Sequence, residues 1–166
     1  TRHMLNCGGL QSDDIARMLG LAADVQIVPF RGEYYFIKPE RRDLVNGLIY
    51  PVPDPTFPFL GVHFTITVHG EVEAGPNAVL AFAREGYRLS DINPGELARI
   101  LSFPGFQKLA RTWWRTGGYE YYRSLNKAEF VRSLQKLVPA IRGADIARGG
   151  AGVRARPTRP AARRSS

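Results

Sequence analysis

The sequence predicts an α+β fold, in which a mixed or antiparallel sheet carries a helical insertion. Residues 62–68 alternate apolar and polar positions, and the surrounding stretch 25–75 is interrupted by proline and glycine, which is typical of strands and turns. Residues 93–138 instead show helix caps and apolar residues at helical spacing. The length of 166 residues suits one domain or a large part of one.

The N-terminal residues predict a strand, a turn and a helix. Residues 3–7 form a short strand-like stretch, Gly8-Gly9 follows, and a helix is expected over 13–19 with Ser12 as its N-cap. Asp13 suits the positive end of the helix dipole. A strand, a glycine turn and a helix start can expose backbone N–H groups to a phosphate. The spacing alone favours a turn without a ligand.

Residues 25–37 predict a long strand or a bent pair of strands. Pro29 and Gly32 interrupt this stretch and indicate a bulge or a close approach of backbones. Arg31 lies between them. It can bind an anionic group of a substrate or cofactor, or it can pair with a carboxylate such as Glu33.

The stretch Leu48–Thr65 is the most informative part of the chain. Its four prolines predict a stiff, extended loop between two strands; they are Pro51, Pro53, Pro55 and Pro58. His63 lies in the exit strand, expected over 62–68, on the face opposite Val62, Phe64, Ile66 and Val68. A turn at His69-Gly70 and a return strand over 71–75 complete a hairpin. His63 can serve proton transfer or packing alone.

Three helices are expected after the hairpin. The first begins at the N-cap Asn93, and the second runs from Gly105 to Arg115 and stops at Gly117-Gly118. The third begins near Tyr119 or Asn126 and ends at Val138. Their aromatic residues are expected to pack in cores and interfaces rather than to stack on bases.

The net charge of +8 comes mainly from residues 148–166, which hold six arginines and no acidic residue. The rest of the chain, with 17 basic and 15 acidic residues, is nearly balanced and does not favour a nucleic-acid-binding domain. A strand is expected to begin at Val153, followed by a disordered Arg/Pro-rich tail. The single cysteine excludes a disulfide framework, and no metal site is expected. No stretch has the length of a transmembrane helix or the pattern of a secretory signal.

Several segments resemble a known family. HMLNCGGLQSDDIARMLG is similar to a segment of the FAD-dependent D-amino-acid oxidase superfamily. IVPFRGEYY, LIYPVPDPTFPFLGVHFT, GPNAVLAFAREGY and AGVRA resemble one branch, the L-2-hydroxyglutarate oxidases/dehydrogenases. The resemblance runs from about Arg2 to Arg156. It implies a flavoprotein that oxidises L-2-hydroxyglutarate to 2-oxoglutarate and passes a hydride to FAD, with an electron acceptor that the sequence does not identify.

The resemblance also implies roles for individual residues. Asn6, Cys7, Gly8 and Gly9 would end a strand of a Rossmann-like FAD-binding domain, and Arg31-Gly32 would mark the crossing into the substrate domain, with Gly32 beside the cofactor. His63 would accept the substrate's hydroxyl proton. Arg154 would bind a carboxylate through two parallel hydrogen bonds. Tyr50, Asn77 and Arg31 are further substrate-pocket candidates.

The resemblance divides the chain into three parts. Residues 1–24 would end the FAD-binding domain, residues 25–147 would form the substrate domain with a helical segment at about 93–138, and residues 148–166 would begin a family strand and continue as a disordered tail, read here as a frameshift product. The family's Gly-x-Gly-x-x-Gly phosphate turn does not occur in the sequence. The chain is therefore expected to be an internal fragment, inactive alone and weak in binding FAD.

Two other functions stay open. Within the superfamily, the substrate can instead be an amino acid or glycerol phosphate. Outside it, the chain can be a non-catalytic module that binds anionic partners through its arginine tail, with nucleic acid disfavoured by the balanced body. The expected location is the bacterial cytoplasm, with peripheral association at the inner membrane as an open alternative.

Overall fold

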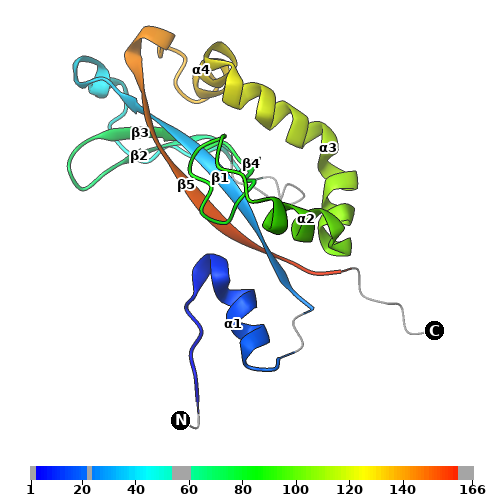
Figure 1. Cartoon of the computed structure of the whole chain (residues 1–166). Coiled ribbons are helices and arrows are strands. Elements are labelled where there is room, and N and C mark those ends of the chain that lie inside the picture. Colours follow the sequence, from blue (N-terminus) through cyan, green and yellow to red (C-terminus); the bar gives the residue numbers. More distant parts are fainter. Residues whose placement is uncertain (1–2, 22–23, 54–60, 161–166) are drawn as a thin grey trace. The chain divides into compact units, whose positions relative to one another are not determined.

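The computed structural model describes residues 3–21, 24–53 and 61–160 (Figure 1). The chain divides into two compact units, each assembled from separate stretches. Unit 1 comprises Thr1–Arg31, Leu80–Arg115 and Val153–Ser166, and unit 2 comprises Gly32–Val79 and Thr116–Gly152. The helices and the antiparallel strand pairs confirm the α+β class. In the described part of the chain, no helix is long and apolar enough to cross a membrane.

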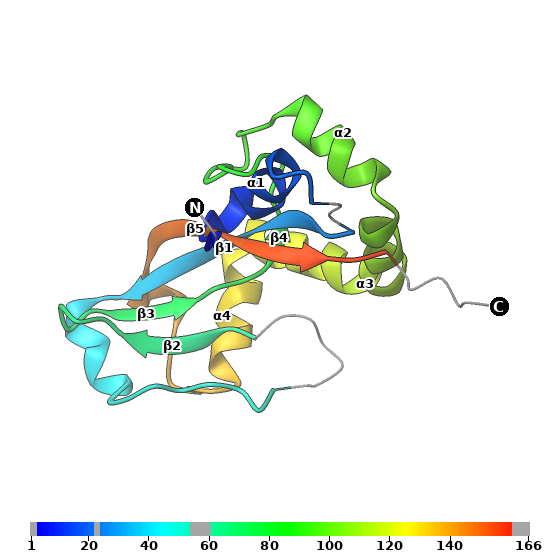
Figure 2. The same ribbon diagram turned by 90° about the horizontal axis from the view of Figure 1, so that it is seen from below.

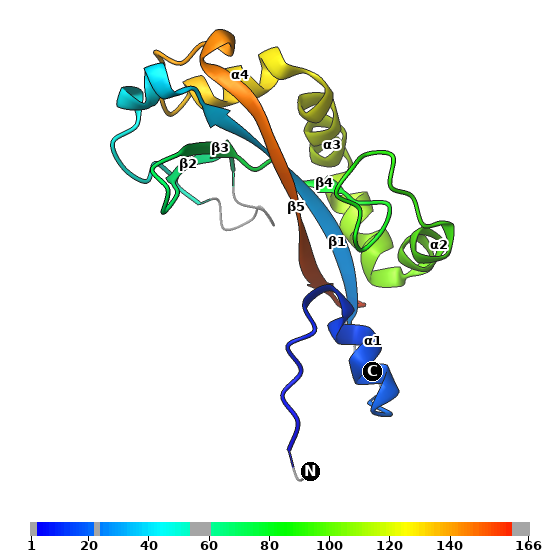
Figure 3. The ribbon, with the colours of Figure 1, turned by 60° about the vertical axis from the view of Figure 1, so that its left-hand side comes forward.

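Five strands form one sheet in the order β2-β3-β1-β4, with β5 also paired to β1. Their bounds are β1 Gln26–Ile37, β2 His63–Ile66, β3 Val72–Gly75, β4 Val79–Leu80 and β5 Ile146–Thr158. β1 and β5 are the long strands, and they lie side by side in each view (Figures 1 and 3). The chain passes from one unit to the other within β1, β4 and β5, and once more within helix α3, Pro104–Leu125.

β1 is a single continuous strand, as one of the two sequence interpretations predicted. Pro29 is accommodated inside it, and its carbonyl accepts a hydrogen bond from the Ala81 N–H at 3.0 Å. Gly32 marks the expected close approach. A Cβ atom built on Gly32 would lie 2.5 Å from the Cβ of Pro76 and 3.0 Å from the carbonyl oxygen of Asn77. Glycine is therefore required here by packing.

Replacing Gly32 by alanine is expected to lower the free energy of unfolding by about 1–3 kcal/mol, the usual range for overpacking. Gly150→Ala is the matched control, because no heavy atom lies within 4 Å of the position of its added Cβ. Urea unfolding of the two variants measures the difference. Equal midpoints would contradict the assigned packing role of Gly32.

The core of unit 2 lies between the β2–β3 hairpin, β1 and helix α4, Lys127–Gln135 (Figure 2). Phe64 of β2 and Phe130 and Leu134 of α4 are fully buried. The rings of Tyr35 and Phe130 pack with their centroids 4.7 Å apart. This packing fixes α4 against the sheet and buries the apolar side of the hairpin.

The hairpin is shorter than the sequence predicts. β2 ends at Ile66, and the turn follows at once, with the Gly70 N–H donating to the Thr67 carbonyl at 3.0 Å. Val68, which was assigned to the buried face, is 96% exposed. Alternation of apolar residues thus continues past the point where the strand leaves the core. Pro55 and Pro58 of the preceding loop lie outside the described residues, whereas 51–53 have no helical or strand structure.

Two of the three predicted helix starts are confirmed by their caps. The Asn93 side chain accepts from the Gly95 and Glu96 N–H groups and begins α2, Pro94–Ser102. The Asn126 side chain accepts from the Ala128 and Glu129 N–H groups and begins α4. An Asn side chain satisfies backbone donors that the first helical turn leaves unpaired.

The predicted helix end at Gly117-Gly118 is wrong, because α3 continues through both glycines. Each glycine in a helix interior costs about 1 kcal/mol relative to alanine. Buried polar residues in the next turns offset that cost: Glu120, Arg123 and Ser124 all form hydrogen bonds inside unit 2. The irregularity of α3 lies instead at Trp113, where φ is −117° and ψ is 19°.

The N-terminal strand predicted over 3–7 is also wrong. These residues are exposed and form no strand. Ser12 is not the N-cap either. A 3-10 turn over Gly9–Gln11 places Gln11 at the cap position, and Ser12 is the first residue of α1, Ser12–Met18. A strand needs a hydrogen-bonding neighbour, and among the described residues none pairs with this stretch.

β5 begins at Ile146, seven residues before the predicted position, and it continues through Pro157 and Thr158, which were expected to belong to the disordered tail. This segment has few apolar residues, so its sequence did not indicate that it pairs with β1. The glycines permit close contact: a Cβ on Gly149 would lie 2.8 Å from the Tyr34 carbonyl oxygen. The predicted disorder of 161–166 falls outside the described residues.

Unit 1 contains a buried ion pair. The Arg84 guanidinium holds the Asp13 carboxylate through two hydrogen bonds, of 2.7 and 2.9 Å. The carboxylate also accepts from the Ile27 N–H at 3.1 Å and from Arg17. Only 1% of the Asp13 side chain is exposed. These bonds tie α1 to the start of β1 and to the loop after β4.

The Asp13 carboxylate makes the stability of unit 1 sensitive to acid. Burial alone raises its pKa, but hydrogen bonds from Arg84 and Ile27 and the charge of Arg84 outweigh burial and place the pKa below the ordinary 3.8. The ionised form is therefore favoured by folding. Its contribution is complete above the unfolded pKa and is lost as the pH falls through the folded pKa. The free energy of unfolding of unit 1, expressed relative to its value at neutral pH, is expected to fall below about pH 4 in the wild type. It is expected to fall less in Asp13→Asn, because asparagine does not titrate.

Candidate active site

His63 begins β2 and pairs with Gly75 of β3. The flanking residues Val62 and Phe64 are buried in the core of unit 2, and this packing holds the backbone on either side of the histidine. The side chain of His63 is itself mostly buried, with the residue 8% exposed. Its Nδ1 atom lies 3.0 Å from the carbonyl oxygen of Gly61.

The structure brings Tyr50, a predicted pocket residue, against His63. The two rings stack with centroids 4.2 Å apart and an angle of 19° between their planes. An antiparallel bridge between Ile49 and Phe64 causes this contact, because it aligns the residues next to each of them. The Tyr50 hydroxyl lies 3.2 Å from the Thr65 hydroxyl, so the tyrosine ring is fixed at both ends.

Asn77 is buried, and both ends of its amide bond to Glu33. Its Oδ1 accepts from the Glu33 N–H at 2.7 Å, and its Nδ2 donates to the Glu33 carboxylate at 3.0 Å. The same carboxylate oxygen accepts from the Ser124 hydroxyl at 2.5 Å. Glu120 of α3 accepts from the neighbouring Ala78 N–H at 3.0 Å. The second half of α3 therefore clamps the turn that carries Asn77.

Sequence reasoning did not identify this clamp. Glu33 was considered only as a partner for Arg31, and Glu120 and Ser124 follow two glycines that were expected to end a helix. The one available signal was a run of polar residues at helical spacing in α3: Glu120, Arg123 and Ser124. All three are buried, and Arg123 donates to Glu120 at 2.5 Å.

The remaining predicted substrate residues lie in unit 1. Arg31 is buried, and one of its guanidinium nitrogens lies 3.4 Å from the Tyr87 carbonyl oxygen, which accepts its hydrogen bond. Arg154 is an exposed residue of β5. His63 belongs to unit 2 and Arg154 to unit 1. That both residues contact the same substrate therefore stays a prediction.

Four of the five predicted cofactor residues, Asn6, Cys7, Gly8 and Gly9, form a largely exposed turn before α1. The fifth, Gly32, is buried in β1 against Pro76. The Asn6 side chain accepts from the Gly8 N–H at 3.0 Å and donates to the Ser12 carbonyl at 2.8 Å. Cys7 is exposed as a free thiol. Gly9 has a φ of +52°, and no heavy atom lies within 4 Å of the position of a Cβ there. The backbone of this turn is therefore open to a ligand on the Gly9 side.

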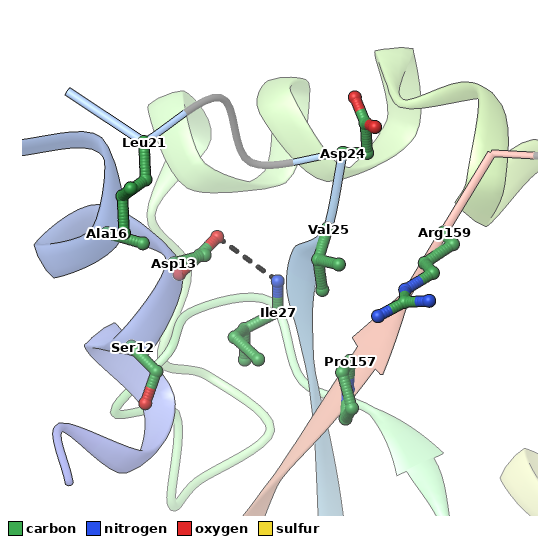
Figure 4. A pocket seen from close by; sticks show the side chains of 9 residues that line it. All are labelled: Ser12, Asp13, Ala16, Leu21, Asp24, Val25, Ile27, Pro157 and Arg159. Atoms are coloured by element: carbon green, nitrogen blue, oxygen red, sulfur yellow. Dashed lines mark hydrogen bonds between the residues drawn. The ribbon is translucent and has the colours of Figure 1, made fainter. Parts of the chain in front are cut away.

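A pocket of about 590 Å³ in unit 1 contains none of the predicted site residues (Figure 4). It lies beside α1, the start of β1 and the end of β5. Its lining consists of Ser12, Asp13, Ala16, Leu21, Asp24, Val25, Ile27, Pro157 and Arg159. The Asp13 carboxylate in its wall is already bonded to Ile27 and Arg84. The other charged residues of the lining are Asp24 and Arg159.

Comparison with known proteins assigns the sequence to a family. A sequence model described as "FAD dependent oxidoreductase" matches residues 1–165. The chain belongs to the FAD-dependent oxidoreductase family. This assignment confirms the superfamily resemblance found in the sequence.

Similar proteins from several organisms are named L-2-hydroxyglutarate dehydrogenase. The chain is 58% identical over 156 residues to an L-2-hydroxyglutarate dehydrogenase of Indibacter alkaliphilus, covering 93% of the chain and 39% of the relative. It is 53% identical to the mitochondrial L-2-hydroxyglutarate dehydrogenase of Nematostella vectensis and 48% identical to that of Homo sapiens. In both, the match covers 93% of the chain, and it covers 34% and 33% of those relatives. The chain thus spans between a third and two fifths of the length of these relatives.

The turn Asn6–Gly9 fits a part of a FAD site, because Gly9 leaves its backbone accessible. The Asn6 hydrogen bonds hold the turn in one shape, which would let it contact a flat ligand without reorganising. The phosphate-binding turn Gly-x-Gly-x-x-Gly is absent from the 166 residues. The residues present therefore suit contact with FAD but do not supply its pyrophosphate site.

The isolated 166-residue chain is expected to purify without bound flavin, because the pyrophosphate site provides a large share of dinucleotide affinity. Absorbance in the visible flavin bands, relative to protein, measures this. The full-length Indibacter relative, purified in parallel, is the positive control. Stoichiometric flavin on the 166-residue chain would contradict the expectation.

Proposed function

We propose that this chain forms the substrate-side part of an enzyme that oxidises the 2-hydroxyl group of L-2-hydroxyglutarate to give 2-oxoglutarate. The supporting observation is that relatives named for this substrate match 93% of the chain, at up to 58% identity, and that the match includes the stretch with Tyr50 and His63. When bound, FAD would supply the hydride acceptor. In this proposal residues 1–24 end the Rossmann-like FAD-binding domain and residues 25–147 form the substrate domain.

The proposal gives His63 the role of proton acceptor. Oxidation of an alcohol removes the hydroxyl proton as well as a hydride, and a histidine near neutral pH is suited to accept that proton. His63 is held by stacking, by the Gly61 carbonyl and by the core on either side, so its ring direction is set before substrate binds. Such preorganisation is what a general base requires.

Arg154 is the proposed carboxylate ligand, whereas Arg31 and Asn77 are proposed to contribute in other ways. Arg154 is exposed on β5, and a guanidinium matches the planar geometry of a carboxylate. Arg31 is buried near a backbone carbonyl, where it can add positive potential for a dianionic substrate. Asn77 is committed to Glu33, so its proposed contribution is to hold the pocket wall.

A chimeric enzyme tests the proposal. Residues 3–158 of this chain would replace the matching stretch of the Indibacter alkaliphilus relative, which supplies the remaining sequence. Flavin-bound chimera is expected to reduce an artificial electron acceptor with L-2-hydroxyglutarate, but not with its D-enantiomer, amino acids or glycerol phosphate. The unaltered relative is the control. A flavin-bound, folded chimera that is inactive with L-2-hydroxyglutarate, or that prefers one of the other substrates, would overturn the proposal.

A further inference from the structure

The contact between His63 and Gly61 determines which ring nitrogen of the histidine carries hydrogen. A backbone carbonyl can only accept a hydrogen bond. Because the Nδ1 atom lies 3.0 Å from the Gly61 oxygen, Nδ1 must be the donor. In a neutral imidazole the other nitrogen, Nε2, then has no hydrogen and holds the lone pair.

Tyr50 restricts the ring so that this hydrogen bond persists. The tyrosine ring lies nearly parallel to the imidazole, at an angle of 19°, and blocks rotation of His63 out of the stack. Tyr50 is itself fixed by the Ile49–Phe64 bridge in the backbone and by the contact between its hydroxyl and that of Thr65. These contacts all belong to unit 2.

We propose that the Gly61 carbonyl and the Tyr50 ring together hold His63 in the Nδ1–H tautomer, so that Nε2 is the proton-accepting atom. Tyr50 is then a positioning residue that acts through His63. The tautomer follows from contacts within this chain alone. Only the use of Nε2 as a base for the substrate hydroxyl rests on the proposed function.

Nitrogen NMR of the ¹⁵N-labelled 166-residue chain tests the tautomer directly. A long-range ¹H–¹⁵N spectrum at about pH 8, where an ordinary histidine is neutral, distinguishes the protonated from the unprotonated ring nitrogen. The chain has three histidines, and the signals that vanish in His63→Asn belong to His63. Free imidazole side chains in water favour the Nε2–H form, so exposed His3 and His69 are internal references. We expect His63 alone to show Nδ1–H.

Two variants separate the stacking role from the hydroxyl contact. Tyr50→Phe keeps the ring and is expected to keep the Nδ1–H form, whereas Tyr50→Leu removes the stack and is expected to give a mixture of tautomers. Unchanged amide signals of Phe64 and Val72 show that the hairpin is intact in each variant. If Tyr50→Leu disrupts the hairpin, the tautomers of wild type and Tyr50→Phe still decide the assignment.

Two results would overturn the inference. The first is an Nε2–H or mixed signal for His63 in the wild-type chain. The second is a Tyr50→Leu chain, with its hairpin intact, that keeps Nδ1–H as completely as wild type, because Tyr50 would then not position the ring. Neither result depends on turnover. An inactive chimera with His63 in the Nδ1–H form would instead refute the proposed function and leave this inference standing.

Discussion

Replacing Arg84 by methionine is expected to lower the free energy of unfolding of unit 1 by about 3 kcal/mol or more. The substitution leaves the Asp13 carboxylate, 1% exposed, without the guanidinium that binds both of its oxygens. Removing one partner of a buried ion pair typically costs about 3–5 kcal/mol, because the remaining charge stays desolvated. Arg17 and the Ile27 N–H remain and favour the lower end of that range.

Urea unfolding followed by tryptophan fluorescence measures this effect in the right place. The chain has two tryptophans, Trp113 and Trp114, and both lie in unit 1. Arg99→Met is the matched control, because Arg99 is half exposed and its pair with Asp14 is worth at most about 1 kcal/mol. The double variant Asp13→Leu/Arg84→Met is expected to recover part of the loss. An Arg84→Met midpoint equal to that of Arg99→Met would show that the pair does not hold unit 1 together.

Replacing His63 by asparagine in the chimeric enzyme is expected to lower kcat with L-2-hydroxyglutarate by about 10²–10⁴-fold, the usual contribution of a general base. Asparagine cannot accept a proton, yet it is polar and smaller than histidine, so it can occupy the same position. Flavin absorbance relative to protein is measured for each variant, so that rates are compared per bound flavin. Steady-state rates measured by reduction of an artificial acceptor give kcat and KM separately.

His69→Asn is the control for this experiment. His69 lies exposed in the turn between β2 and β3, so the same chemical change occurs six residues away without touching the stack on Tyr50. It should leave kcat unchanged. A His63→Asn chimera that keeps kcat within about tenfold of the parent would exclude His63 as the principal base.

The features that sequence reasoning predicted correctly are local ones. The caps at Asn93 and Asn126 depend on a side chain and backbone groups two or three residues away, so their pattern can be read directly. Gly32 was recognised as a point of close approach, although its partner Pro76 could not be named. The long strand β1 was predicted only as one of two alternatives, the other being a bent pair of strands.

The errors arose where distant residues decide the local structure. Residues 147–153, rich in glycine, became part of β5 because β1 offers a partner for pairing. α3 runs through Gly117-Gly118 because Glu120 and Ser124 find buried partners outside the helix. The stack of Tyr50 on His63 depends on the bridge between Ile49 and Phe64, across a proline-rich loop whose path no local rule predicts. Resemblance had named both residues, but not their contact.

Every passage of the chain between the two units occurs inside a strand or a helix, which decides how this protein can be divided. Cleavage of an exposed loop by a protease would therefore not release either unit intact. Recombination has the same difficulty, because a gene crossover at any of the four passages would split β1, β4, α3 or β5 between two parents. Because each unit is assembled from separate stretches of the chain, neither can be transferred to another protein as one continuous segment.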